Sequence, residues 1–447
     1  MNQEEKYIYM TTEPIPKLIC SLAIPTIISM LVTSFYNMAD TFFVGRINTQ
    51  ATAAVGVVFS VMSLIQAFGF FFGHGSGTYI SRKLGCKEME DATTMASNGF
   101  FLSFFCGIVI MILGIIFLEP IAILLGSTPT VLPYAKDYLR IILFGTPFMT
   151  SSLVLNNQLR FQGSAAYGMV GIVTGAIINI ILDPILIFGF KMGISGAALA
   201  TTISQICSFI LLFIMNKKSG GMEISLKNIT VNFYYIKEIV RGGFPSICRQ
   251  GIAAFAIILL NQTAGTYGDE FIAGMSIVSR ITMFANSALI GFGQGFQPVC
   301  GFNYGARLYA RVREGFWFCV KWAFIFLLIV SVLCVIFAPS LVSLFRKDDL
   351  EVIKIGTLAL RLQCLAFPLN AWIVVSNMML QSIGKVIQAS VIASARQGIF
   401  FVPLILILPL LFGSLGIQLT QPVSDILTLL LSVPLSVGVL REMKKEI

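Results

Sequence analysis

Two carboxylates interrupt segments that are otherwise uncharged and apolar, and they are the first candidates for chemistry in this chain. Asp40 ends the stretch IPTIISMLVTSFYNMAD, and Asp183 lies within GAIINIILDPILIFGF. An ionised carboxylate in the middle of a bilayer costs about 2.5–3.5 kcal/mol even on insertion scales. A chain that carries this cost twice usually uses the groups to bind a proton, a metal ion or a charged substrate. The two residues therefore predict coupled transport.

Polar side chains share a helix face with each carboxylate. Tyr36 and Asn37 precede Asp40 by four and three positions, and residues at these spacings face the same side of an α-helix. Asn179 precedes Asp183 by four positions. Each segment is thus expected to present a carboxylate with a polar neighbour.

The sequence around the second carboxylate offers further oxygen atoms. Pro184 has no amide donor, so the carbonyl oxygen of Ile180 loses its usual helical partner. Thr201 and Gln205 stand four positions apart in the next apolar segment. Three segments of one half thus offer polar faces that can converge on an ion. Ordinary hydrogen bonding between helices is the alternative role of Thr201 and Gln205.

Two carboxylates that share a poorly hydrated pocket cannot both ionise cheaply. Such a pair takes up a proton or an alkali cation and releases it when a cationic substrate competes, which is the chemistry of an antiporter. The alternative for Asp40 and Asp183 is a position near a helix end, from which the side chain reaches water.

The composition indicates that membrane helices must position these residues. Of the 447 residues, 56% are hydrophobic and 11% are charged, whereas a soluble domain carries about 25% charged residues. The net charge of +9 is spread over short loops, which favours a role in membrane topology over nucleic-acid binding. The nine cysteines form no CxxC pair and His74 is the single histidine, so we expect no cofactor and no metal beyond a sodium ion at the two carboxylates.

We expect an all-α polytopic membrane protein with twelve transmembrane helices in two pseudo-symmetric six-helix lobes. The apolar segments are roughly residues 17–42, 53–80, 94–117, 132–155, 165–188, 195–215, 236–262, 272–300, 315–338, 355–379, 387–411 and 415–439. The polar interval NKKSGGMEISLKNITVN separates six segments from six. We therefore predict an N-terminal lobe at 1–216, a cytoplasmic linker at 217–235 and a C-terminal lobe at 236–447.

The basic residues orient the chain. If both termini are cytoplasmic, the inside segments hold 19 of the 30 Lys and Arg residues and the outside segments hold eight. Short cytoplasmic loops carry an excess of Lys and Arg, so we predict a multi-pass plasma-membrane protein with both termini inside.

The two halves repeat at an offset of about 220 residues. LAIPTIIS matches GGFPSICR, which places Pro25 over Pro245, and FFGHGSGTYISRKLGCK matches GFGQGFQPVCGFNYGAR, which places Gly75 over Gly295. Each copy contains six segments, an even number, so the second copy enters the membrane from the same side as the first. The repeats are therefore parallel, as in transporters with two rocking lobes. The matching glycines predict close packing or bending of the helices rather than a phosphate cradle, because no strand precedes them.

The second half does not repeat the carboxylates. Arg396 and Asp425 lie within its apolar segments, and we interpret them as a structural ion pair, with gating or substrate binding as the alternative. Arg249 and Arg280 are interpreted as markers of helix ends near the membrane surface. His74, which lies among glycines, is interpreted as a side chain that is packed or lies at the lipid interface, rather than as a proton carrier.

Four blocks resemble the multidrug and toxic compound extrusion (MATE) family: YNMADTFFVG, GTYISRKLG, NIILDPILIFG and GAALAT. The resemblance covers essentially the whole chain. It implies two six-helix lobes arranged as a V and drug efflux driven by inward proton or sodium flow. Bending of the first helix at the position of Pro25 is also a theme of the family, and a proline permits it.

Within that family, carboxylates confined to the N-terminal half resemble the DNA-damage-inducible-protein-F branch. This resemblance implies a cation site built by Asp40, Asn179, Asp183 and Thr201. The supporting residues of the substrate cavity are then expected to be Tyr36, Asn37, Tyr138, Asn156, Asn157, Thr202 and Gln205. The branch with acidic residues in the seventh and eighth spans matches poorly, because Asn261, Gln262 and Asn286 are uncharged.

The sequence therefore predicts a secondary active multidrug exporter, not an enzyme, that exchanges H⁺ or Na⁺ for small amphipathic, cationic compounds by alternating access. We expect it to work as a monomer in the lipid bilayer and to bind no nucleic acid. The alternative is a flippase of the same superfamily for lipid-linked saccharides. It would require one cavity lined by Arg249, Arg280 and Arg396 together to bind the pyrophosphate.

Overall fold

The computed structural model describes residues 3–230, 232–345 and 349–446. Arg346 and Lys347, two of the basic residues used to predict the orientation, lie outside these ranges. The helices of the first half are α1 (Gln3–Thr12), α2 (Ile15–Val44), α3 (Thr49–Gly85), α4 (Met89–Ile116), α5 (Leu118–Leu124), α6 (Leu132–Phe161), α7 (Ala165–Pro184), the π-helical turn η1 (Ile185–Gly189) and α8 (Ile194–Lys218).

A connecting segment contains the short 3₁₀ turn η2 (Leu226–Asn228). The helices of the second half are α9 (Phe233–Gly265), α10 (Asp269–Gly305), α11 (Tyr309–Ser343), α12 (Leu350–Ala366) with the 3₁₀ turn η3 (Phe367–Leu369), α13 (Asn370–Ser382), α14 (Val386–Ser394), the π-helical turn η4 (Ala395–Ile399), α15 (Phe401–Phe412) and α16 (Ser414–Lys445).

Twelve segments of the described chain are long and apolar enough to cross a membrane, which confirms the predicted fold class. The short helix α1 was not predicted, because ten partly acidic residues carry only a weak helix signal. Tertiary contacts hold it in place. Lys6 Nζ donates to the carbonyl oxygen of Ser219 at 2.9 Å, and Met10 is only 1% exposed.

The internal repeat is visible in the backbone. Helices α3 and α10 each contain 37 residues, and their bounds differ by the predicted offset. Gly193 and Gly413 precede α8 and α16 with φ/ψ of 58°/−134° and 59°/−138°. This region of φ favours glycine because a Cβ would clash with the backbone. The two copies therefore use the same turn before their sixth helices.

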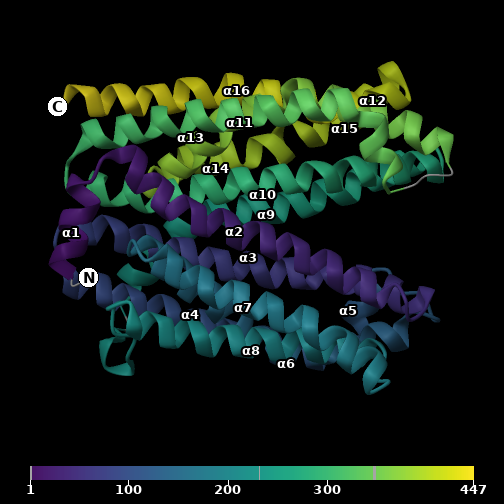
Figure 1. Ribbon diagram of the computed structural model, residues 1–447, viewed down its shortest axis with the longest axis horizontal. Helices are drawn as coiled ribbons and strands as arrows, with labels where there is room; N and C mark the ends of the chain where they lie inside the picture. The colour runs from purple at the N-terminus through teal and green to yellow at the C-terminus, as the bar shows by residue number, and fades with distance from the viewer. Residues whose placement is uncertain (1–2, 231, 346–348, 447) are drawn as a thin grey trace.

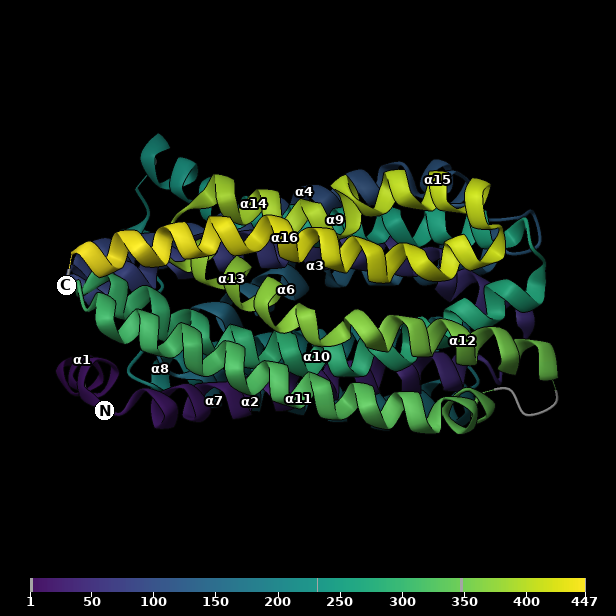
Figure 2. The same ribbon diagram turned by 90° about the horizontal axis from the view of Figure 1, so that it is seen from above.

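The long helices run along the longest axis of the molecule, and both termini lie at the same end (Figure 1). Helices α9–α16 lie on one side and α3–α8 on the other, with α2 between them (Figure 1). The view turned by 90° also places the two termini together (Figure 2). The residue bounds proposed for the lobes and the linker stay a prediction.

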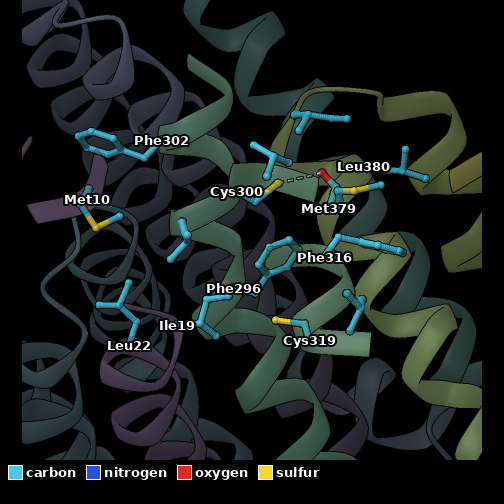
Figure 3. Close-up of a cluster of buried hydrophobic side chains, with 14 of the residues drawn as sticks. Met10, Ile19, Leu22, Phe296, Cys300, Phe302, Phe316, Cys319, Met379 and Leu380 are labelled. Carbon is cyan, nitrogen blue, oxygen red and sulfur yellow. Dashed lines mark hydrogen bonds between the residues drawn. The ribbon is translucent and has the colours of Figure 1, made fainter. Parts of the chain in front are cut away.

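The end that carries the termini is tightly packed. Figure 3 shows part of its core, where side chains of α1, α2, α10, α11 and α13 meet, among them Met10, Ile19, Phe296, Phe316 and Met379.

Glycines bring the backbones of the two halves together at this end. A Cβ on Gly75 of α3 would meet the carbonyl oxygen of Ile239 in α9, and one on Gly295 of α10 would meet Ala23 in α2. The prediction that these glycines serve close packing is confirmed.

Prolines have different effects on two of the helices. After Pro184 the α-helical pattern of α7 changes to the π-turn η1, a change that frequently marks functional sites. Pro25 lies inside the uninterrupted helix α2, where the hydroxyl of Ser29 donates to the Pro25 carbonyl oxygen at 2.9 Å. A bend at Pro25 stays a prediction.

Candidate functional site

The two carboxylates lie on neighbouring helices, because α2 packs against α7. Asp183 is 0% exposed, and neither of its carboxylate oxygens has a hydrogen-bond partner among the described residues. Asp40 is partly exposed, but its Oδ1 atom is buried and also lacks a partner in this part of the chain. The two groups are close enough for their charges to interact. They therefore form one electrostatic unit.

Three predicted residues surround this pair. Asn179 Nδ2 donates to Thr201 Oγ1 at 3.3 Å, which links α7 to α8. Asn179 Oδ1 is buried, and no described residue donates to it. The fully buried Tyr138 of α6 faces Asp40, Asp183 and Thr201, yet its hydroxyl makes no hydrogen bond of ordinary geometry with a residue that the structure describes. The site thus contains several oxygen atoms that await a donor or a cation.

These orphaned oxygen atoms determine what the site can bind. A buried polar group without a partner costs free energy, and such groups in native proteins call for an explanation. A proton would convert one carboxyl group into a donor. A hard cation would instead be ligated by carboxylate, amide and hydroxyl oxygens. The residues present fit either ion.

A cavity of about 220 Å³, which we call the carboxylate-side cavity, is lined by neighbours of this pair on α2 and α7, although neither carboxylate is among its lining residues. Five predicted residues line it, namely Tyr36, Asn37, Asn156, Asn179 and Gln205. Its lining also includes Gln66 and the hydroxyl residues Ser29, Ser34, Ser152 and Ser204, which the sequence analysis missed. Serines give little signal in a sequence, because in helices they often bond to their own backbone, as Ser204 does with the carbonyl oxygen of Thr201.

Three residues predicted for the cavity do not line it: Tyr138, which lies at the carboxylates, and Asn157 and Thr202, which lie elsewhere. Asn157 packs against α3, because a Cβ on Gly73 would meet its side chain. Within α6, its Nδ2 donates to the Leu153 carbonyl oxygen at 2.6 Å and its Oδ1 accepts from Arg160 at 2.6 Å. Thr202 donates to the carbonyl oxygen of Ile141 at 3.1 Å and so ties α8 to α6. Both side chains point away because a helix turns by about 100° per residue, so Asn156 and Thr201 take the inward positions.

In the second half, Arg396 Nε donates to Asp425 Oδ1 at 2.8 Å. Gln421 Nε2 donates to the same oxygen at 2.8 Å, and Asn370 Nδ2 donates to Oδ2 at 3.0 Å. The carboxylate of Asp425 is 0% exposed. The two residues thus form the ion pair that the sequence analysis favoured, whereas a gating role for them stays untested.

The interpretation of Arg249 as a helix-end residue is wrong. It lies in the middle of α9, which begins at Phe233, and donates from Nη1 to Asn377 Oδ1 at 3.1 Å. Arg249 and Arg396 line one cavity, but Arg280 is exposed on α10 and is not among the residues that line it. The basic cluster required by the flippase alternative is therefore incomplete.

A buried hydrogen-bond network joins helices of both halves and includes the single histidine. Arg160 Nη1 donates to Gln294 Oε1 at 2.5 Å, and Nη2 donates to Asn157 Oδ1 and lies 3.2 Å from His74 Nε2. His74 Nδ1 lies 3.1 Å from the carbonyl oxygen of Phe70. His74 is fully buried, in agreement with its interpretation as a packed side chain.

Within the described chain, twelve apolar spans enclose two carboxyl groups with oxygen atoms that lack donors, and a cavity lined partly by polar side chains lies next to them. These features define a multi-pass membrane transporter. The MatE family model matches residues 25–185 and 245–407, and the chain therefore belongs to this family of transporters. The two matched stretches reproduce the internal repeat.

Relatives match over nearly the full length. The multidrug export protein MepA of Staphylococcus haemolyticus is 28% identical over 421 residues, which cover 93% of this chain and 92% of the relative. MepA of Staphylococcus aureus is 27% identical with the same coverage.

Solved structures also match over nearly the full length of the chain. An outward-facing multidrug resistance MATE family transporter of the MOP superfamily has a TM-score of 0.92, 26% identity and 98% coverage of both chains. A MOP superfamily transporter from Pyrococcus furiosus, described as having a binding pocket of reverse polarity, gives the same values.

Proposed function

We propose that the protein is a secondary active multidrug exporter that exchanges H⁺ or Na⁺ for amphipathic, cationic compounds. The observation that carries this proposal is the pair Asp40 and Asp183. Among the described residues, neither oxygen of Asp183 nor Oδ1 of Asp40 has a hydrogen-bond donor, and neighbours of the pair on α2 and α7 line the carboxylate-side cavity. The family assignment and the names of the relatives support export. They favour it over the transfer of lipid-linked saccharides.

Competition for the carboxylates couples the two fluxes. A coupling cation bound at the pair neutralises negative charge, and a cationic compound in the adjacent cavity is repelled by that cation and attracted by the free carboxylates. Binding of the coupling cation therefore releases the cationic compound, and binding of the compound releases the cation. Asn179, Thr201 and Tyr138 orient the oxygens, and Tyr36 and Gln205 extend the polar surface into the cavity.

A one-for-one exchange of a proton for a monovalent cation moves no net charge, so the pH gradient alone would drive it. Each pH unit then supplies about 1.4 kcal/mol, which is a tenfold ratio of substrate across the membrane.

The proposed setting is the plasma membrane, with both termini in the cytoplasm and the monomer as the working unit. The excess of Lys and Arg in the segments on the side of the termini supports this orientation. The end that carries the termini is closed by packing between the two halves, so the cavities would open toward the outside.

The test uses purified protein in liposomes with a fluorescent cationic dye as substrate. Dye added to cation-loaded protein should release H⁺ or Na⁺, recorded with a pH-sensitive dye or with radioactive sodium. We expect Asp183→Asn and Asp40→Asn to abolish both cation release and uphill dye transport. Asp137→Asn is the matched control, because this exposed carboxylate lies on α6 next to Tyr138 and makes the same change of charge.

The two ions give different results in the same vesicles. Release of protons with no dependence on sodium assigns H⁺, and the opposite result assigns Na⁺. Transport by Asp183→Asn at the wild-type rate and with wild-type cation release would overturn the proposal.

A further inference from the structure

A second cavity, of about 400 Å³, lies between helices of both halves, and we call it the arginine cavity. Arg249 of α9 and Arg396 of η4 line it together with the amide side chains of Gln250, Asn286, Asn377 and Gln397. None of the described residues that line it is an aspartate or a glutamate. Its polarity is therefore opposite to that of the site around Asp40 and Asp183.

The two arginines of this cavity differ in their partners. Arg396 is paired with the buried carboxylate of Asp425. Arg249 donates to the neutral Asn377, and no carboxylate of the described residues forms an ion pair with it. Arg160 is also close enough to Arg249 for the two positive charges to repel each other. Arg249 therefore carries a positive charge that the described side chains leave uncompensated.

An uncompensated guanidinium inside a membrane protein is costly and usually functional. The guanidinium has five N–H donors in a planar fork, which matches the two oxygens of a carboxylate or the oxygens of a phosphate. Among the described residues, Arg249 has one hydrogen-bond acceptor, Asn377 Oδ1, which it reaches with Nη1. The remaining donors are free to bind an anionic group that enters the cavity.

The rest of the cavity suits the apolar body of such a compound. Ala253, Ile257, Ile290, Val374 and Met378 line it. Its volume lies within the range of about 300–1,000 Å³ that is usual for small-molecule sites. Apolar walls with a few polar groups that fix the orientation are typical of such sites.

We propose that the arginine cavity binds the anionic group of an amphipathic organic compound, a carboxylate, sulfonate or phosphate, with Arg249 as its anchor. Binding at this cavity does not depend on cation coupling, whereas its use in export rests on the proposed function. The ligand is either a compound to be exported or the headgroup of an anionic lipid, and both present the same chemistry to Arg249.

The test measures binding with a matched pair of dyes, a xanthene dye that bears a free carboxylate and its methyl ester. Fluorescence polarisation gives the affinity of each dye for the full-length protein in lipid-free detergent micelles. The wild type should bind the acid more tightly than the ester. Arg249→Gln should weaken binding of the acid by about tenfold or more, the effect of one charge-assisted hydrogen bond, and leave the ester unchanged.

Two further variants separate loss of charge from loss of structure. Arg249→Lys keeps the charge and should recover part of the affinity for the acid. Arg280→Gln removes an exposed arginine from α10 and should leave the affinity for both dyes unchanged. Equal affinity of the wild type for both dyes, or equal loss of both in Arg249→Gln, would overturn the proposal.

Nanodiscs distinguish the two sources of the anion. If phosphatidylglycerol weakens binding of the acid to the wild type but not to Arg249→Gln, while phosphatidylcholine has no effect, then a lipid headgroup occupies the cavity. If neither lipid competes, the ligand is the soluble compound. Asp183→Asn should keep the preference for the acid, so failure of the coupling proposal would leave this result intact.

Discussion

The ion pair in the second half allows a quantitative test of what a buried charge contributes to this fold. We expect Asp425→Leu to lower the free energy of unfolding by about 3–5 kcal/mol, since breaking a buried pair leaves the other charge uncompensated. The loss should fall near the lower end of that range, because the Arg396 side chain is 19% exposed and reaches the arginine cavity.

Removing both charges should lower the free energy of unfolding much less than removing one of them. Replacement of a buried ion pair by apolar residues of similar volume is often neutral or stabilising, so we expect Arg396→Met with Asp425→Leu to unfold near the wild-type midpoint. A double-mutant cycle then gives the coupling between the two residues.

Unfolding is followed in mixed micelles with increasing denaturing detergent by tryptophan fluorescence. Trp372 is a suitable reporter because it lies two residues from Asn370, a hydrogen-bond partner of Asp425, and bonds to Ser436 in α16. If Asp425→Leu unfolds like the wild type, or if the double variant loses the sum of the single effects, the charges are solvated and the reasoning fails.

Three further predictions concern packing, the cation site and helix capping. Gly75→Ala should destabilise the protein by about 1–3 kcal/mol in the same unfolding assay, because its Cβ would meet the backbone of α9. Gly56→Ala on the same helix has open space and should be neutral or stabilising. Thr201→Val should weaken the apparent affinity for the coupling cation in transport assays by about fivefold, whereas Thr202→Val should not, since only Thr201 bonds to Asn179. Asn48→Ala should lower stability by about 1 kcal/mol, because its side chain accepts from Ala51 N and caps α3; exposed Gln50→Ala is its control. Unchanged unfolding of Asn48→Ala, or equal cation affinities of the two threonine variants, would contradict these assignments.

The fold and the centre of the candidate site follow from the sequence because both depend on local patterns. The length of the apolar segments predicted the membrane helices, and the spacing of four residues predicted that Asn179 and Asp183 share one helix face. The cost of a charge in the membrane singled out both carboxylates without knowledge of their surroundings.

The errors arose where the decisive partner is distant in the sequence. Nothing near Arg249 shows that Asn377, 128 positions away, meets it in the middle of a helix. Asn156 and Asn157 are adjacent, so helical periodicity alone cannot say which one faces the cavity. That depends on the rotation of α6 against its neighbours, which only tertiary packing fixes.

The matching turns at Gly193 and Gly413 have a consequence for the history of the molecule. Two copies that keep the same backbone at an offset of 220 residues indicate duplication of an ancestral six-helix gene, whose product would have assembled as a parallel homodimer. Such an ancestor would have had chemically identical chambers. The carboxylate pair Asp40 and Asp183 in the first half and Arg249 in the second would then have arisen after the fusion.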